Sequence, residues 1–140
     1  MIRVKKISSD NLNILRLCEN IAIENLIENG GELQFSKTIY ECDEIYCILK
    51  NERIVGYVAL KYGYRLKDDA YIMQVAIKKD FQRKGYGTIL YNYIKKDLIN
   101  INYLTCDIKE KNINSINFHI KNGFIPKKYV NLILYQYKLQ

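Results

Sequence analysis

The stretch from residue 70 to residue 108 constrains the fold more than any other part of this chain. Ala70–Ile77 is an apolar run bounded by charges, which predicts a central strand buried on both faces. Gln82–Gly87 holds two glycines one residue apart, and the segment from there to about Asn100 has apolar residues at helical spacing. Tyr103–Ile108 predicts a second strand. A strand, a helix and a strand in this order predict parallel pairing with a right-handed crossover.

The glycine loop, Gln82–Gly87, is the strongest chemical signal in the sequence. Two glycines at a strand-to-helix junction let several backbone N–H groups approach one anion, whose charge the helix dipole favours. Arg83 and Lys84 add cationic side chains at the same place. An isolated Gly-x-Gly is usually only a turn, but the flanking strand and helix favour a phosphate cradle here.

The N-terminal part predicts a strand followed by helical structure. Met1–Ile7 alternates apolar and basic residues, and Ser8–Asp10 offers N-cap side chains. Leu12–Ile27 has roughly helical spacing, and Gly30 and Gly31 stop it, so we expect one broken helix or two short ones. The segment 32–44 is polar and mixed, and its structure is the hardest to predict from the sequence.

The remaining segments complete the expected order. Ile45–Leu49 and Ile54–Tyr62 predict two antiparallel strands joined by a short polar turn, with a bulge at Gly56. Asn114–Asn122 predicts a helix closed by Gly123, and Leu132–Leu139 predicts a last strand preceded by a loop with Pro126. The order is therefore β-α-α-β-β-β-α-β-α-β, in one domain over residues 1–140.

Composition limits the class of protein. No apolar run approaches the roughly 20 residues that span a bilayer, and no secretion signal is recognisable, so we expect a soluble, cytoplasmic protein. The four cysteines form no Cys-x-x-Cys pair and the chain has one histidine, so we expect free, buried thiols and no metal site. The net charge of +7 suits a nucleic acid, an acidic partner or a polyanionic cofactor.

Three features resemble the GNAT superfamily of N-acetyltransferases along most of the chain. The first is the strand Val75–Ile77 followed by Gln82-x-x-Gly85-x-Gly87, which resembles the family's pyrophosphate loop. The second is Asn112–Phe124, with Ser115 and His119 three and seven residues after Asn112 and Gly-Phe at its end. The third is the strand Leu104–Ile108 between them. The resemblance implies an α/β (α+β) fold with a mixed central sheet and helices on both faces.

The resemblance also implies a cofactor, acetyl-CoA, and the residues that bind it. In the family the central strand pairs with the pantetheine arm through its backbone, and the loop holds the pyrophosphate. The implied cofactor-binding residues are Val75, Ala76, Ile77, Gln82, Arg83, Lys84, Gly85, Tyr86, Gly87, Thr88, Asn112 and Ser115. No metal is implied.

The implied chemistry needs an acid and a base. A lysine-like amine, with a pKa of about 10.4, must lose a proton before it attacks a thioester, and the leaving thiolate needs a proton or a hydrogen bond. His119 is the candidate acid, although many members have Tyr there. No glutamate precedes Val75 where some members keep a base, so Asp69, Tyr71 and Gln74 are alternative bases or positioners. Tyr86 is expected to be a packing residue or a lid.

Three functions remain open at this stage. The first is acetyl transfer to a primary amine of a small molecule or a protein, and the second is a GNAT-like module that binds CoA without transfer. The third is a small basic nucleic-acid-binding module, which we do not favour because most tyrosines occupy packing positions. Homodimers are common in the family. A cationic acceptor would suit an acidic rim made of Glu28, Glu32, Glu41, Asp43 and Glu44.

Overall fold

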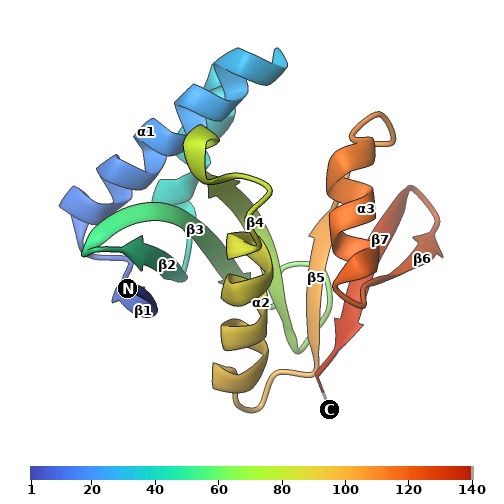
Figure 1. The fold of residues 1–140 in the computed structure, drawn as a ribbon. Helices are drawn as coiled ribbons and strands as arrows, with labels where there is room; N and C mark the ends of the chain where they lie inside the picture. The colour runs from blue at the N-terminus through green and yellow to red at the C-terminus, as the bar shows by residue number, and fades with distance from the viewer. Residues whose placement is uncertain (140) are drawn as a thin grey trace. The chain divides into compact units, whose positions relative to one another are not determined.

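Seven strands, three α-helices and two 3₁₀ helices form the chain over residues 1–139, the part that the computed structural model describes. Figure 1 follows them from β1 in blue to β7 in red. The elements are β1 (Ile2–Ser8), α1 (Leu12–Asn29), η1 (Leu33–Glu41), β2 (Glu44–Lys50), β3 (Arg53–Tyr62), β4 (Asp69–Ile77), η2 (Lys79–Phe81), α2 (Tyr86–Asp97), β5 (Tyr103–Asp107), α3 (Ile113–Lys121), β6 (Ile125–Tyr129) and β7 (Leu132–Lys138).

The strands form one mixed sheet in the order β1-β2-β3-β4-β5-β7-β6. The predicted mixed α/β fold is therefore confirmed. The contacts within the chain group into two compact units, residues 1–61 with 73–97 and residues 62–72 with 98–140. The units are described separately below, and the single domain stays a prediction. None of the helices within residues 1–139 is long and apolar enough to cross a membrane.

In the first unit, β1, β2 and β3 form an antiparallel sheet, in which the pairing of β2 with β3 is the one that the sequence predicted. Asn51 and Glu52 join β2 to β3 with positive φ at both residues (51° and 66°), the backbone of a type I′ hairpin. The arrangement is supported from β1, because the Arg3 guanidinium pairs with the Glu52 carboxylate at 2.6 Å.

The helix α1 is continuous, so the prediction of a broken helix or two short ones was wrong. Its buried side chains include Leu15, Cys18 and Ala22, which follow a spacing of three and four residues. The prediction considered only large aliphatic residues, so it missed a buried stripe that includes a cysteine and an alanine. The N-cap is Asn11, whose side chain accepts from Ile14 N–H, rather than a residue of 8–10, while Gly30 ends the helix in the left-handed conformation as expected.

Helices cover both faces of β2. Ile45, Cys47 and Leu49 pack with α1 and η1 in the main core. On the opposite face, the Tyr46 hydroxyl donates to Asp97 of α2 at 2.6 Å. Because successive side chains alternate across a strand, β2 is buried on both sides. The segment 33–41, which the sequence left unassigned, is the 3₁₀ helix η1.

Gly56 lies at the predicted irregularity in β3. The register with β2 shifts between Ile48 and Leu49, which pair with Gly56 and Ile54. A Cβ at Gly56 would lie 2.4 Å from Cδ1 of Ile77 and 3.1 Å from the carbonyl oxygen of Ala76. The absence of a side chain therefore allows β3 to approach these residues closely.

The second unit contains the start of β4 together with β5, α3, β6 and β7. Residues 69–71 of β4 pair with residues 103–105 of β5 in parallel, as the strand–helix–strand order predicted. β5 pairs with β7, and β7 with β6, in antiparallel fashion. The prediction missed β6, because it is an edge strand with five exposed residues that include Pro126 and two lysines. Such residues discourage further pairing at an edge.

We predict that Gly56→Ala lowers the free energy of unfolding by about 1–3 kcal/mol, the usual cost of overpacking. Ile77→Val removes the Cδ1 atom that the new methyl group would meet, and alone costs about 0.5–1.5 kcal/mol. The double variant should therefore lose less stability than the sum of the single variants. Urea unfolding of all four proteins measures this, and strictly additive losses would contradict the proposed contact.

Candidate functional site

The glycine loop, Gln82–Gly87, forms a turn that ends at the start of α2. Arg83 and Gly85 have φ of 60° and 86°, and the first helical bond runs from Ile89 N–H to Gly85 C=O at 3.0 Å. The earliest N–H groups of a helix have no partner within it. Within the described residues, a Cβ on Gly85 would meet no atom within 4 Å beyond its chain neighbours. The space beside Gly85 is thus open, and the residue is exposed.

The Gln82 side chain holds the loop rather than reaching outward. Its Nε2 donates to Ile77 C=O at 2.9 Å and to the Asn25 side chain at 3.2 Å. Asn25 donates to the same carbonyl of Ile77 at 3.1 Å. Of the side chains predicted to contact phosphate, Arg83 and Lys84 are exposed cations, whereas Gln82 fastens the loop to β4 and α1.

Tyr86 lies at the first position of α2 and is 5% exposed. Its ring packs against Phe81 at a centroid distance of 5.9 Å. The Nζ atom of Lys84 lies 5.9 Å from the same Phe81 ring. Of the two roles expected for Tyr86, packing is the one its surroundings favour.

The predicted pantetheine strand is the last part of β4. Val75 and Ile77 are half-buried and Ala76 is buried, which continues an alternation along β4. The sequence predicted burial on both faces, but one face of this strand keeps partial exposure. Because the carbonyl of Ile77 already accepts two amide hydrogen bonds, we expect any new hydrogen bond of Ile77 to use its N–H group.

Ser115 and His119 lie one turn apart on α3, and Asn112 directly precedes this helix. Asn112 is the N-cap, and its side-chain oxygen accepts from Ser115 N–H at 3.2 Å. One turn later, His119 Nδ1 lies 2.7 Å from Ser115 C=O and 3.4 Å from Ser115 Oγ. Asn112 therefore shapes the start of the helix, and its side-chain oxygen is engaged in the cap.

His119 is 2% exposed and lies between two aromatic rings, with centroids 5.2 Å from Phe118 and 5.1 Å from Phe124. Since a carbonyl can only accept, the short contact to Ser115 places the proton on Nδ1. Burial lowers the pKa of His119 below its ordinary value, and the hydrogen bond to Ser115 opposes this effect. The shift favours a neutral imidazole at neutral pH, opposite to the protonated form expected for an acid.

Each unit thus gathers one part of the predicted site. The first unit contains Val75–Ile77 and Gln82–Thr88, and the second contains Asn112, Ser115 and His119. Their assignment to acetyl-CoA binding and acid catalysis stays a prediction.

Asp69 and Gln74 have structural partners that leave little room for a catalytic role. Asp69 is fully buried and accepts from three backbone N–H groups of the β3–β4 loop and from the Thr105 hydroxyl at 2.6 Å. Gln74 accepts from the Tyr57 hydroxyl at 2.8 Å and donates to Phe35 C=O at 2.8 Å. Both residues fix the chain around them.

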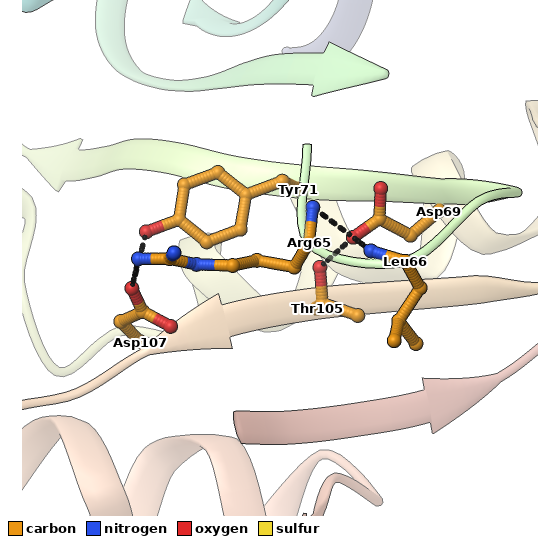
Figure 2. A network of polar contacts seen from close by, with 6 residues as sticks. All are labelled: Arg65, Leu66, Asp69, Tyr71, Thr105 and Asp107. Atoms are coloured by element: carbon orange, nitrogen blue, oxygen red, sulfur yellow. Dashed lines mark hydrogen bonds and ion pairs between the residues drawn. The ribbon is translucent and has the colours of Figure 1, made fainter. Parts of the chain in front are cut away.

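Tyr71 belongs to a polar cluster that Figure 2 shows from close by. Its hydroxyl donates to the Asp107 carboxylate at 3.1 Å, and the same carboxylate forms a close ion pair with Arg65. Burial raises the pKa of Tyr71, as does the neighbouring Asp107 carboxylate. Tyr71 therefore stays protonated at neutral pH and is a poor general base.

The sequence analysis did not single out Arg65 or Asp107. They are 42 residues apart, and Arg65 stood in what looked like an ordinary polar turn. One signal was available, since Asp107 ends β5 and the parallel pairing of β4 with β5 brings Tyr71 opposite Thr105. Asp107 is two residues beyond Thr105, so its side chain lies on the same face of β5 as that of Thr105.

The groove of the second unit, the cysteines and the possible metal ligands were compared with the predicted site residues. A groove of about 540 Å³ in the second unit is lined mainly by the β6–β7 hairpin and contains none of the predicted site residues. All four cysteines are buried and free, as predicted. Within residues 1–139, no group of three or more His, Cys, Asp and Glu residues is arranged to hold a metal ion.

Known proteins share this fold. The acetyltransferase from Thermus thermophilus has a TM-score of 0.76 at 17% identity, covering 99% of this chain and 97% of that one. The catalytic domain of the Tetrahymena GCN5 histone acetyltransferase in complex with coenzyme A has a TM-score of 0.72 at 21% identity, covering 100% and 94%. The ribosomal-protein-S18-alanine N-acetyltransferase from Escherichia coli has a TM-score of 0.70 at 15% identity, covering 99% and 94%.

At these identities the likeness shows the fold alone, and no curated protein matches the sequence. The family assignment depends on a sequence model of the acetyltransferase (GNAT) family, which matches residues 14–124. This match includes the glycine loop, β5 and the helix that carries His119. The chain belongs to the acetyltransferase (GNAT) family.

Proposed function

We propose that this protein transfers the acetyl group of acetyl-CoA to a primary amine of a small molecule or a protein. The observation that carries the proposal is the glycine loop, which leads into α2 with Gly85 open to solvent and two cationic side chains beside it. A pyrophosphate suits this place, because free N–H groups, the helix dipole and the cations all favour negative charge.

The residues of the loop would divide the work of binding. The backbone from Gly85 to Thr88 would supply N–H donors to the pyrophosphate, and Arg83 and Lys84 would supply charge. Gln82 would act indirectly, by fixing the loop to Ile77 C=O. Because these contacts are made by one strand-to-helix junction, we expect binding to need little rearrangement of the chain.

In the proposed reaction, the amine nitrogen attacks the thioester carbonyl, a C–N bond forms and the C–S bond breaks. Negative charge develops on the carbonyl oxygen, and a backbone N–H of Val75 or Ile77 would stabilise it. The thiolate leaves with the electron pair of the C–S bond and then takes up a proton. The attacking nitrogen releases its proton to a base or to water.

A module that binds CoA without transfer is the alternative function. One observation favours it: Asp69 and Gln74 are held by structural hydrogen bonds, and the pKa of Tyr71 is raised. None of the three residues is therefore well suited to take the proton of the amine. Transfer through water would still be possible, because a base can act through one intervening water molecule.

The acceptor class is supported only by likeness. Two proteins of similar fold are named for protein acceptors, namely histone and the alanine of ribosomal protein S18. A protein amine or a small amine is therefore the class to test. Two members of the expected acidic rim, Glu28 and Glu44, pair with Lys79 and Lys6 at 3.3 Å and 3.1 Å.

Mass spectrometry of an amine panel incubated with acetyl-CoA tests the proposed function. The panel should contain polyamines, aminoglycosides, amino acids, and peptides with lysine or free N-termini. A product heavier by one acetyl group identifies the acceptor class. CoA binding without any acetylated product would instead support the alternative function.

We predict that Gly85→Glu weakens acetyl-CoA binding at least tenfold, about 1.4 kcal/mol, because a carboxylate would repel the pyrophosphate. Isothermal titration calorimetry measures the dissociation constant. Gly30→Glu is a matched control, because Gly30 also has positive φ (72°) and open space at its Cβ position. The control should bind like the parent, and equal binding by Gly85→Glu would contradict the assignment of the loop.

We predict that His119→Gln lowers kcat about 100-fold, at the lower end of what acid–base groups contribute. Because the active acid would be the protonated imidazole, its contribution should decline as pH rises through the lowered pKa of His119. Phe118→Leu is the control, since it disturbs the same packing without removing the titrating group. An unchanged kcat in His119→Gln would identify His119 as a packing residue.

The lowered pKa of His119 also predicts a change of stability with pH. Because the imidazole holds its proton less tightly in the folded state, the unfolded chain binds more protons, and the free energy of unfolding falls as pH drops below about 6.5. His119 is the only histidine of the chain. Urea unfolding between pH 7.5 and 5.5 should show a slope in the parent, and His119→Gln should show a smaller one.

A further inference from the structure

The peptide that joins Ile77 to Lys78 ends β4, and both of its polar groups have partners within the first unit. The N–H of Lys78 donates to the carbonyl of Val55 in β3 at 2.8 Å. The carbonyl of Ile77 accepts from the side-chain amides of Asn25 at 3.1 Å and of Gln82 at 2.9 Å. Because a carbonyl oxygen has two lone pairs, these two donors satisfy it. The chain therefore leaves β4 in a fixed direction.

Asn25 holds Gln82 as well as the end of the strand. While its Nδ2 donates to Ile77, its Oδ1 accepts from Gln82 Nε2 at 3.2 Å. Gln82 is exposed, and an exposed glutamine with no such partner samples several rotamers. Asn25 is half-buried on the continuous helix α1. Asn25 thus restricts the conformation of the residue with which the glycine loop begins.

The C-terminal half of α1 also contacts η2, the short element between β4 and the glycine loop. The Glu24 carboxylate accepts from the backbone N–H of Lys79 at 3.4 Å. One turn later, the Glu28 carboxylate pairs with Lys79 Nζ at 3.3 Å. Residues four apart lie on the same face of a helix. Two neighbouring turns of α1 therefore hold the segment that leads into the loop.

The glycine loop needs support from outside because of its own backbone. Arg83 has a φ of 60°, in the left-handed region that a residue with a side chain rarely adopts, and Gly85 follows with 86°. The side chains of Arg83 and Lys84 are exposed. Such a conformation persists only where the surrounding structure holds it. The hydrogen bonds of Asn25 and Gln82 supply such a restraint where the loop begins.

We propose that Asn25 is a positioning residue for the pyrophosphate of acetyl-CoA. It keeps Gln82 and the carbonyl of Ile77 in place, and so holds the loop in the conformation whose N–H groups would bind the pyrophosphate. A loop that is ordered before binding loses less freedom on binding, which increases affinity. This inference rests on the proposed function and adds to it a residue of α1 that lies outside the loop.

The proposal also concerns the choice of acetyl carrier. S-acetylpantetheine has the thioester of acetyl-CoA but no pyrophosphate. If Asn25 acts through the glycine loop, its removal should weaken the use of acetyl-CoA and spare that of S-acetylpantetheine. Asn25 would therefore favour carriers with a pyrophosphate over shorter ones.

A calorimetric titration with CoA tests the proposal without any transfer step. We expect Asn25→Ala to bind CoA about tenfold more weakly than the parent, because the loop must then be ordered on binding. Asn20→Ala is a matched control, because Asn20 is exposed on the same helix and alanine raises the helix propensity equally at both positions. The control should bind like the parent. Thermal unfolding of each variant checks that it is folded.

A double-mutant cycle distinguishes positioning from a general loss of stability. Asn25 and Gln82 act through one junction, so we expect Asn25→Ala, Gln82→Ala and the double variant each to lose about tenfold in CoA affinity. Independent effects would instead multiply to about a hundredfold in the double variant, and this result would overturn the proposal. Urea unfolding of the same proteins measures stability separately from affinity.

Steady-state kinetics supply the second test, with an acceptor identified in the amine panel. We expect Asn25→Ala to raise KM for acetyl-CoA about tenfold and to lower kcat by less than about twofold. Its kcat/KM for S-acetylpantetheine should stay within about twofold of the parent value. An equal loss of kcat/KM for both carriers would contradict a role through the pyrophosphate loop.

The outcomes separate this inference from the proposed function. Weaker CoA binding by Asn25→Ala, in a protein that acetylates no amine, would support the positioning role and contradict transfer. Acetylation by the parent, with Asn25→Ala indistinguishable from Asn20→Ala in CoA affinity and KM, would overturn the positioning role and leave transfer established. A parent protein that binds no CoA would contradict both.

Discussion

The buried carboxylate of Asp69 is the constraint on which the second unit depends. A charge with no solvent exposure costs several kcal/mol unless hydrogen bonds replace its water, and here three backbone N–H groups and the Thr105 hydroxyl do so. The same bonds join the β3–β4 loop, β4 and β5. The loop shape that brings Arg65 onto Asp107 therefore follows from satisfying one charge at the start of β4.

The first unit has a comparable junction at the other end of β4. The carbonyl of Ile77 accepts from Asn25 of α1 and from Gln82 of the glycine loop, so one acceptor connects a helix, a strand and a loop. Gln82 can therefore matter to the proposed phosphate loop without touching phosphate. The loop keeps its N–H groups and its two cations available because another side chain supplies its internal support.

The sequence predicted the fold where local patterns are strong and failed where the pattern depends on distant partners. The run Ala70–Ile77 and α2 were readable because each has an apolar pattern with clear ends, and the glycine loop was readable from its two glycines between them. The continuity of α1 was missed because Cys18 and Ala22 belong to its buried stripe, and β6 was missed because an edge strand with Pro126 has no buried face. The ion pair of Arg65 with Asp107 spans 42 residues, and only the pairing of β4 with β5 makes it visible.

The proposed transfer to an amine needs a group that takes up the proton of the amine. Asp69 cannot accept it without giving up hydrogen bonds that hold the loop, and Tyr71 is protonated at neutral pH. The neutral form of His119, with its proton on Nδ1 toward Ser115, has an acceptor at Nε2 rather than a proton to donate there. Acting as the acid would thus require the protonated form of His119, which its burial disfavours.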